Sequence, residues 1–269
     1  MVPINPRAKT SRSKGMKGNS SWLKVLLSVL GFIILVGASV IVAQLIIGYF
    51  MIWILGADTF NEPVPTAIYS ALSYILALIF IIFSPILMAK FRRKKGGGQI
   101  MNKRELGLSG WPTWMGIGLS VAGFIIYLIF AAILTAFFNI FPWFNVSEAQ
   151  DVGFSVYISG VDRLVAFITL VIIAPVAEEI IFRGWLYTSL RKKFSEKTTE
   201  KVAIVLTTIL VSLLFGLVHM QWNVGVNVFA MSVVLCALRE VTGTIYAGIL
   251  THMIKNGVAF YLLFVLGIG

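Results

Sequence analysis

The chain has 269 residues, of which 58% are hydrophobic and 12% are charged, and its mean hydropathy is +0.92. Soluble domains carry roughly 25% charged residues, so this composition excludes an ordinary soluble enzyme and predicts an integral membrane protein. The net charge of +11 is expected to lie in cytoplasmic loops rather than to mark nucleic-acid binding. The single cysteine, Cys236, excludes an intrachain disulfide.

Apolar runs separated by polar loops predict an all-α, polytopic transmembrane bundle of about seven spans. A bilayer is crossed by ~20 apolar residues, and the sixth run is short enough to be a partial span, so six to eight spans fit. The predicted runs are residues 22–55, 66–89, 112–138, 163–188, 202–218, 223–238 and 244–266.

Basic and acidic loops alternate along the chain. Residues 90–104 and 191–201 are rich in Lys and Arg, whereas residues 56–65 and 139–161 carry only acidic charges. Because cytoplasmic loops carry an excess of Lys and Arg, this alternation predicts a cytoplasmic amino terminus. The fourth span then runs from outside to inside, and seven spans put the carboxyl terminus outside.

Between Leu164 and Leu186, the fourth run contains three charged residues, Glu178, Glu179 and Arg183. A charge at the bilayer centre costs at least ~2.5–3.5 kcal/mol, so such residues are candidates for function. Glu179 and Arg183 are four residues apart and can pair along one helix face. Glu178 lies about 100° round the helix and is expected to point to a neighbouring helix. Pro175 removes a backbone hydrogen bond and is expected to kink this helix.

Both histidines of the chain lie in later apolar runs. Phe215 and His219 are four residues apart, and so are His252 and Asn256, so each pair shares a helix face. Histidine can shuttle protons near neutral pH, and Glu178 is a candidate general base for water. The amide of Asn256 can donate to an oxyanion. The set predicts a water-activating hydrolytic site that needs no serine or cysteine nucleophile.

A purely structural role is possible for each residue taken alone, but it explains the whole set less well than a functional site does. A buried ion pair can serve stability alone, one histidine in a membrane helix is often an interhelical hydrogen bond, and Phe215 alone would be core packing. Lys255 is expected to face away from His252 and Asn256, and either to snorkel toward the interface or to lie at the surface. Charged and polar groups in three separate apolar runs nevertheless favour a functional site.

The motifs Glu178-Glu179-x-x-x-Arg183, Phe215-x-x-x-His219 and His252-x-x-x-Asn256 resemble, in the same order, those of the CAAX-protease and bacteriocin-processing (CPBP, or Abi) family of intramembrane proteases. The resemblance covers residues 162–266, and residues 1–161 match only as generic spans. It implies an all-helical membrane fold with the site in a cavity between helices. We therefore divide the chain into a disordered, basic cytoplasmic tail (1–21), amino-terminal transmembrane helices and loops (22–161) and a catalytic core (162–269).

The resemblance implies an endopeptidase that hydrolyses a peptide bond inside this cavity. In the family's scheme, Glu178 and His219 activate water, and His252 and Asn256 stabilise the oxyanion. The remaining matched side chains order the site (Glu179, Arg183) or contact the substrate (Phe215).

We favour a mechanism without a metal, because the helical H-E-x-x-H arrangement of zinc proteases is missing. Zinc held by His219, His252 and Glu178 is the alternative. The expected partners are the lipid bilayer and a peptide or protein substrate, with a lipidated protein and a bacteriocin precursor both open, and no nucleic acid. The expected location is the plasma membrane of a bacterium.

Two other classes of function fit the same residues. One is a non-enzymatic bacteriocin self-immunity or regulatory protein that binds through the same cavity. The other is a proton-coupled transporter with Glu178 and the histidines as a relay. Transporters more often show repeated halves with broken helices, and the sequence shows neither.

The predicted span ends place the site residues at unequal depths. Counted from the cytoplasmic ends, Glu178 lies about 15–18 Å deep and His252 about 12 Å, but His219 lies about 26 Å deep. These residues meet only if the fifth helix is displaced or begins well inside the cytoplasm, for example through residues 195–201. We attribute the mismatch to the span boundaries rather than to the motifs.

Overall fold

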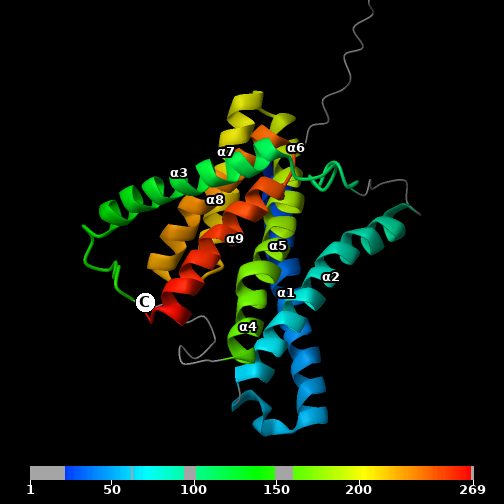
Figure 1. Ribbon diagram of the computed structural model, residues 1–269. Coiled ribbons are helices and arrows are strands. Elements are labelled where there is room, and N and C mark those ends of the chain that lie inside the picture. The colour runs from blue at the N-terminus through cyan, green and yellow to red at the C-terminus, as the bar shows by residue number, and fades with distance from the viewer. Residues whose placement is uncertain (1–21, 62, 94–100, 149–159, 268–269) are drawn as a thin grey trace, which may run out of the picture.

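The computed structural model describes residues 22–61, 63–93, 101–148 and 160–267, and all regular elements among them are helical (Figure 1). Within these residues, seven helices are long and apolar enough to cross a membrane. The prediction of an all-α, polytopic membrane protein is therefore confirmed. The predicted tail 1–21 lies outside the described residues, as do residues 94–100 of the basic loop and 149–159 of the acidic loop.

The helices follow the apolar runs closely, except that the second, fourth and sixth are longer than predicted. The sixth, predicted to be short, is a helix of 21 residues. In chain order the elements are α1 (Trp22–Leu55), the 3-10 turn η1 (Ala57–Asn61), α2 (Pro63–Arg93), α3 (Trp114–Phe138), α4 (Val161–Phe167), the π-helix η2 (Ile168–Ile173), α5 (Ala174–Glu179), the π-helix η3 (Ile180–Tyr187), α6 (Thr188–Ser195), α7 (Glu200–Leu217), α8 (Trp222–Thr242), α9 (Tyr246–Phe260) and the π-helix η4 (Tyr261–Val265).

The segments from α4 to α6 form one helix that carries the charged motif. In Figure 1 it runs between the α1–α2 pair on one side and α3, α8 and α9 on the other. The span within it, Arg163–Ser195, has 33 residues. This central helix thus presents α5 both to α2 and to α9.

A π-helical turn precedes Pro175, and the predicted kink at this proline stays a prediction. The N–H of Ala174 donates to the carbonyl of Thr169, five residues earlier, which is the bond pattern of a π-helix. The next donor in this pattern would be Pro175, which has no N–H. The carbonyl of Leu170 is therefore left to another donor, and a side chain of α9 supplies it, as described below.

Helices α7 and α8 touch through two glycines. A Cβ atom added to Gly216 would lie 2.8 Å from the carbonyl oxygen of Gly225, so only glycine lets the two backbones come this close. Gly216 lies between Phe215 and His219 in the chain. The close contact therefore fixes the end of α7 that carries this motif.

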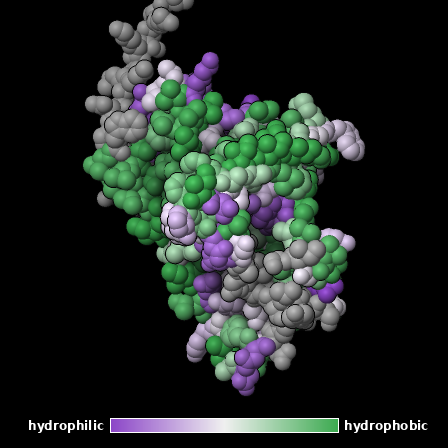
Figure 2. Space-filling model, turned by 90° about the vertical axis from the view of Figure 1, so that its left-hand side faces the viewer, coloured by the Kyte–Doolittle hydropathy of each residue, from purple (hydrophilic) through white to green (hydrophobic). Residues whose placement is uncertain are grey.

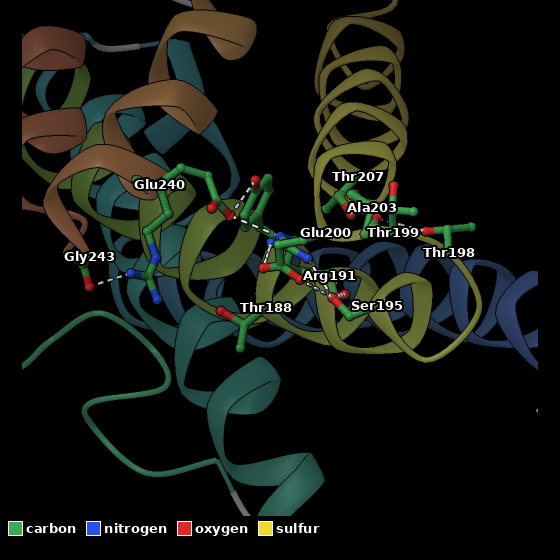
Figure 3. Close-up of polar contacts among 12 residues, drawn as sticks. Thr188, Arg191, Ser195, Thr198, Thr199, Glu200, Ala203, Thr207, Glu240 and Gly243 are labelled. Carbon is green, nitrogen blue, oxygen red and sulfur yellow. Dashed lines mark hydrogen bonds and ion pairs between the residues drawn. The ribbon is translucent and has the colours of Figure 1, made fainter. Parts of the chain in front are cut away.

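A polar cluster ties the turn between α6 and α7 to the end of α8 (Figure 3). Arg191 donates from Nε to Glu240 over 3.1 Å and pairs through Nη2 with Glu200 at the start of α7. The hydroxyl of Tyr187 donates to the same oxygen of Glu240 over 2.8 Å. These contacts hold three helix ends together at one pole of the bundle.

The extended central helix brings Glu178 and His219 to similar distances from the ends of their helices. It ends at Ser195 and not at residue 188, and α7 begins at Glu200. At 1.5 Å per residue, Glu178 lies about 25 Å from Ser195 and His219 about 28 Å from Glu200. The predicted span boundaries were wrong, because charged residues such as Arg191 continue the helix beyond its apolar part. The fifth helix begins only two residues before its predicted start, so the change lies mainly in the central helix.

Candidate active site

Glu179 and Arg183 form a fully buried ion pair within the central helix. Nη1 of Arg183 donates to Oε1 of Glu179 over 2.8 Å, and both side chains are 0% exposed. The guanidinium carbon of Arg183 also lies 4.5 Å from the centre of the Phe215 ring, a favourable cation–π distance. The predicted pairing is confirmed. Loss of either side chain would leave the other as an unpaired buried charge, which is strongly unfavourable.

His252 of α9 lies against both carboxylates of α5. Its Nδ1 is 3.2 Å from Oε1 of Glu179, and its Nε2 is 3.7 Å from Oε2 of Glu178. Gly248, one turn earlier, allows this approach, because a Cβ there would lie 2.9 Å from Oε2 of Glu179. The expectation that Glu178 points to a neighbouring helix is thus met by α9.

Glu178 and His219 line one cavity of about 400 Å³. The side chain of Glu178 is 21% exposed, and it interacts electrostatically with His219. Nδ1 of His219 lies 2.8 Å from the carbonyl oxygen of Phe215, which can only accept, so Nδ1 carries the proton of that bond and Nε2 keeps its lone pair. Figure 2 shows that hydrophilic residues gather in a hollowed band on an otherwise mostly hydrophobic face.

Phe215 packs between the two histidines. Its ring centre lies 5.1 Å from that of His219 and 5.9 Å from that of His252, and Phe182 meets it edge-on at 4.9 Å. Phe215 is 0% exposed yet lines the cavity. The ring therefore spaces the two imidazoles, and its contact with a substrate stays a prediction.

Asn256 binds the carbonyl that the π-helical turn leaves open. Its Nδ2 donates to the oxygen of Leu170 over 2.8 Å, and Leu170 lines the cavity. The amide has two N–H groups, so one remains for a ligand. Its predicted role at an oxyanion is compatible with this contact and stays a prediction.

Lys255 lies closer to the site than the sequence analysis expected. It is half-buried and interacts electrostatically with Glu178 and with His219. Residues three apart on a helix differ by only about 60° in direction, so Lys255 shares the side of α9 that carries His252. The prediction that Lys255 faces away from His252 was therefore wrong.

Sequence reasoning also missed part of the cavity wall. Ser73 and Tyr74 of α2 line the cavity, and Tyr74 interacts electrostatically with Glu178. The signal was present in the sequence as polar residues three or four apart in an apolar span, at Thr66, Ser70 and Ser73.

The donor set for zinc is incomplete in this arrangement. Among the residues with described positions, no three His, Cys, Asp or Glu side chains are placed together to hold a metal ion. His252 and Glu178 lie close to each other, but His219 does not complete a set of three ligands with them. The part played by a metal stays a prediction.

Comparison with known families supports the motif assignment. The model of the type II CAAX prenyl endopeptidase Rce1-like family matches residues 160–258. This segment is similar to that family. In the comparisons with curated proteins and with solved structures, nothing matches the chain. The Rce1-like segment runs from the start of α4 into α9 and contains all three motifs, whereas α1, α2 and α3 lie outside it.

The turn between α7 and α8 within the Rce1-like segment is expected to hold a neutral histidine. Burial lowers the pKa of His219 from its ordinary value, while the charge of Glu178 raises it to a smaller extent. The chain has two histidines, so His252→Gln leaves His219 as the single imidazole for an NMR titration in detergent micelles. We expect a midpoint below about 6.5. A midpoint above 7 would mean that water solvates this ring freely.

Proposed function

We propose that this protein is an intramembrane endopeptidase of the CAAX type, which hydrolyses a peptide bond with a water molecule activated by Glu178 and His219. The family of residues 160–258 supports a peptidase. The observation that carries the mechanism is that Glu178 and His219 line one cavity, with His252 beside Glu178. A general base needs this access to both water and substrate.

The proposed reaction begins with a water molecule held between Glu178 and His219. Glu178 takes a proton from the water molecule, and the oxygen of that water attacks the carbonyl carbon of the substrate. The carbonyl oxygen becomes an oxyanion, which accepts hydrogen bonds from His252 and Asn256. The bond to the leaving nitrogen then breaks, and the proton passes through Glu178 and His219 to the leaving amine.

The buried pair of Glu179 and Arg183 orders this arrangement. Arg183 holds Oε1 of Glu179, and the same oxygen lies 3.2 Å from Nδ1 of His252. A hydrogen bond at one ring nitrogen fixes the orientation of the imidazole and the state of the other nitrogen. Glu179 therefore acts as a positioning residue for His252.

The proposal extends to the surroundings of the protein. The alternation of basic and acidic loops supports a cytoplasmic amino terminus, in the plasma membrane of a bacterium. The substrate is a peptide or protein that reaches the cavity from the bilayer, either lipidated or a bacteriocin precursor. The experiments below must also distinguish this peptidase from a non-enzymatic immunity protein and from a proton-coupled transporter.

The test is cleavage of quenched fluorescent peptides, with and without an S-farnesyl cysteine, by purified protein in lipid nanodiscs. We expect Asn256→Ala to lower kcat by about 10²–10³ with little change in KM, because an oxyanion donor acts mainly in the transition state. We also expect elemental analysis to find no stoichiometric zinc. Asn139→Ala, at the far end of α3, is the matched control.

Three results would change the proposal. About one zinc per chain, lost together with activity in His252→Ala, would replace the metal-free mechanism but keep the peptidase. Binding of peptides without any cleavage would favour the immunity or regulatory protein. Proton-coupled uptake in liposomes without cleavage would favour the transporter.

A further inference from the structure

The wall of the cavity that faces Glu178 comes from helices outside the Rce1-like segment. It is polar along one stripe of α2, an otherwise apolar helix, and residues three or four apart lie on one helix face. α1 adds one amide. The polar lining residues of this wall are Gln44, Tyr69, Ser70, Ser73 and Tyr74.

Ser73 is the most informative residue of this wall. Ser73 is 6% exposed and lines the cavity, and its buried Oγ has no hydrogen-bond partner among the described residues. Buried hydroxyls in folded proteins almost always have a partner. An unpartnered hydroxyl on a residue that lines the cavity is therefore a candidate contact for a ligand's polar group.

The neighbours of Ser73 extend the same polar surface toward the catalytic carboxylate. Tyr74 lines the cavity and interacts electrostatically with Glu178. One turn earlier, the hydroxyl of Ser70 donates to the carbonyl of Thr66 over 3.0 Å, which leaves its oxygen free to accept. The stripe thus offers donors and acceptors in a row that ends beside Glu178.

We propose that Ser70, Ser73 and Tyr74 form a substrate-binding wall that hydrogen-bonds the backbone of an extended peptide whose scissile bond lies at Glu178. This inference rests on the proposed peptidase function. A peptide that leaves water for a membrane cavity must have its N–H and C=O groups satisfied by the protein. Side chains one helical turn apart are about 5–6 Å apart, close to the roughly 6.6 Å between alternate residues of an extended chain.

The chemistry of this wall predicts what kind of peptide binds. Hydroxyl groups read backbone amides in any sequence, so this stripe selects an extended, unfolded segment rather than a particular residue. The apolar members of the same cavity, Ala77, Ile81 and Phe182, would contact its side chains. A helical or folded segment satisfies its own backbone and gains nothing from the hydroxyls.

The test uses the full chain in lipid nanodiscs with the farnesylated fluorescent peptide as probe. We expect Ser73→Ala and Tyr74→Phe each to raise KM about 3–10-fold, the range of one lost hydrogen bond. Ser73→Ala should leave thermal unfolding unchanged, because its hydroxyl has no hydrogen-bond partner within the described part of the chain. The matched controls are Ser84→Ala on the same helix, whose hydroxyl bonds to Ile81, and Tyr49→Phe, which is 77% exposed.

Binding measurements separate this inference from the proposed function. In a Glu178→Gln background, Ser73→Ala should weaken the Kd for the peptide, read by fluorescence anisotropy, by the same 3–10-fold. If the wild type never cleaves the peptide but Ser73→Ala still weakens its binding, the binding wall is retained and the peptidase function is rejected. The wall is overturned if the wild type cleaves the peptide and both Ser73→Ala and Tyr74→Phe have the same KM and Kd as the controls.

A backbone probe decides what the wall contacts. Peptides in which one amide at a time is replaced by an ester lose affinity where that amide is bound. At one position, the ester should weaken binding to the Glu178→Gln protein and have no further effect once Ser73→Ala is added, because both changes remove the same contact. If truncating a peptide side chain is non-additive with Ser73→Ala and no ester substitution is, the inference of backbone recognition is wrong.

Discussion

Glu178→Ala is expected to abolish peptide cleavage while the protein still inserts and folds. Glu178 borders the cavity and has no ion-pair partner in its own helix, unlike Glu179. Loss of a general base costs about 10²–10⁴ in rate, and the conservative Glu178→Gln should lose as much because an amide cannot take the proton. The measurement is kcat for the fluorescent peptide, together with thermal unfolding of each variant.

The control for this experiment is a second carboxylate of the same bundle. Glu240 contacts Tyr187 and Arg191 at the polar pole, far along the chain from the cavity, so Glu240→Gln should stay active. Full activity of Glu178→Ala would remove it from catalysis and favour the binding-protein alternative. If Glu178→Ala loses activity and unfolds while Glu178→Gln stays folded, the role of Glu178 is judged from the Glu178→Gln variant.

Arg183→Met is expected to destabilise the protein by about 3–5 kcal/mol, because it leaves Glu179 unpaired in the interior. Both side chains are 0% exposed, so no solvent is at hand to screen the remaining carboxylate. The double variant Glu179→Gln with Arg183→Met removes both charges and should recover most of that stability. The measurement is the free energy of unfolding in mixed micelles, followed through tryptophan fluorescence.

Activity should not return with stability in the double variant. Glu179 also contacts His252, so its loss frees the imidazole that we place at the oxyanion. A stable but inactive double variant therefore separates the positioning role from the structural one. Arg183→Met with a change in unfolding free energy below 1 kcal/mol would show that water reaches Glu179 and that the pair is not sealed.

The spans were predictable because a bilayer demands long apolar runs. The ends of α1 and α3 agree with the predicted runs within two residues, since polar loops bound them sharply. The end of the central helix was not predictable in this way. Its last turns carry Arg191 and Lys192, and Arg191 is held by Glu200 of the next helix and by Glu240, which is distant in sequence.

The charged motifs were predictable because each charge in a membrane needs a partner. The rest of the candidate site depends on tertiary detail. The bond from Asn256 to Leu170 exists because a π-helical turn precedes Pro175, and no periodicity in the sequence marks a π-helix. The polar stripe of α2, including Ser73, was visible in the sequence, but nothing there indicated that it faces Glu178.

For the proposed peptidase, the long central helix would also act as a molecular ruler for the substrate. Arg191 marks the polar pole of the bundle, and thirteen residues separate it from Glu178, which is about 20 Å along the helix. An extended chain covers about 3.3 Å per residue, so roughly six residues reach from that pole to the cavity. A substrate that is anchored at this pole would therefore be cut at a fixed count from its anchor, largely independent of its sequence.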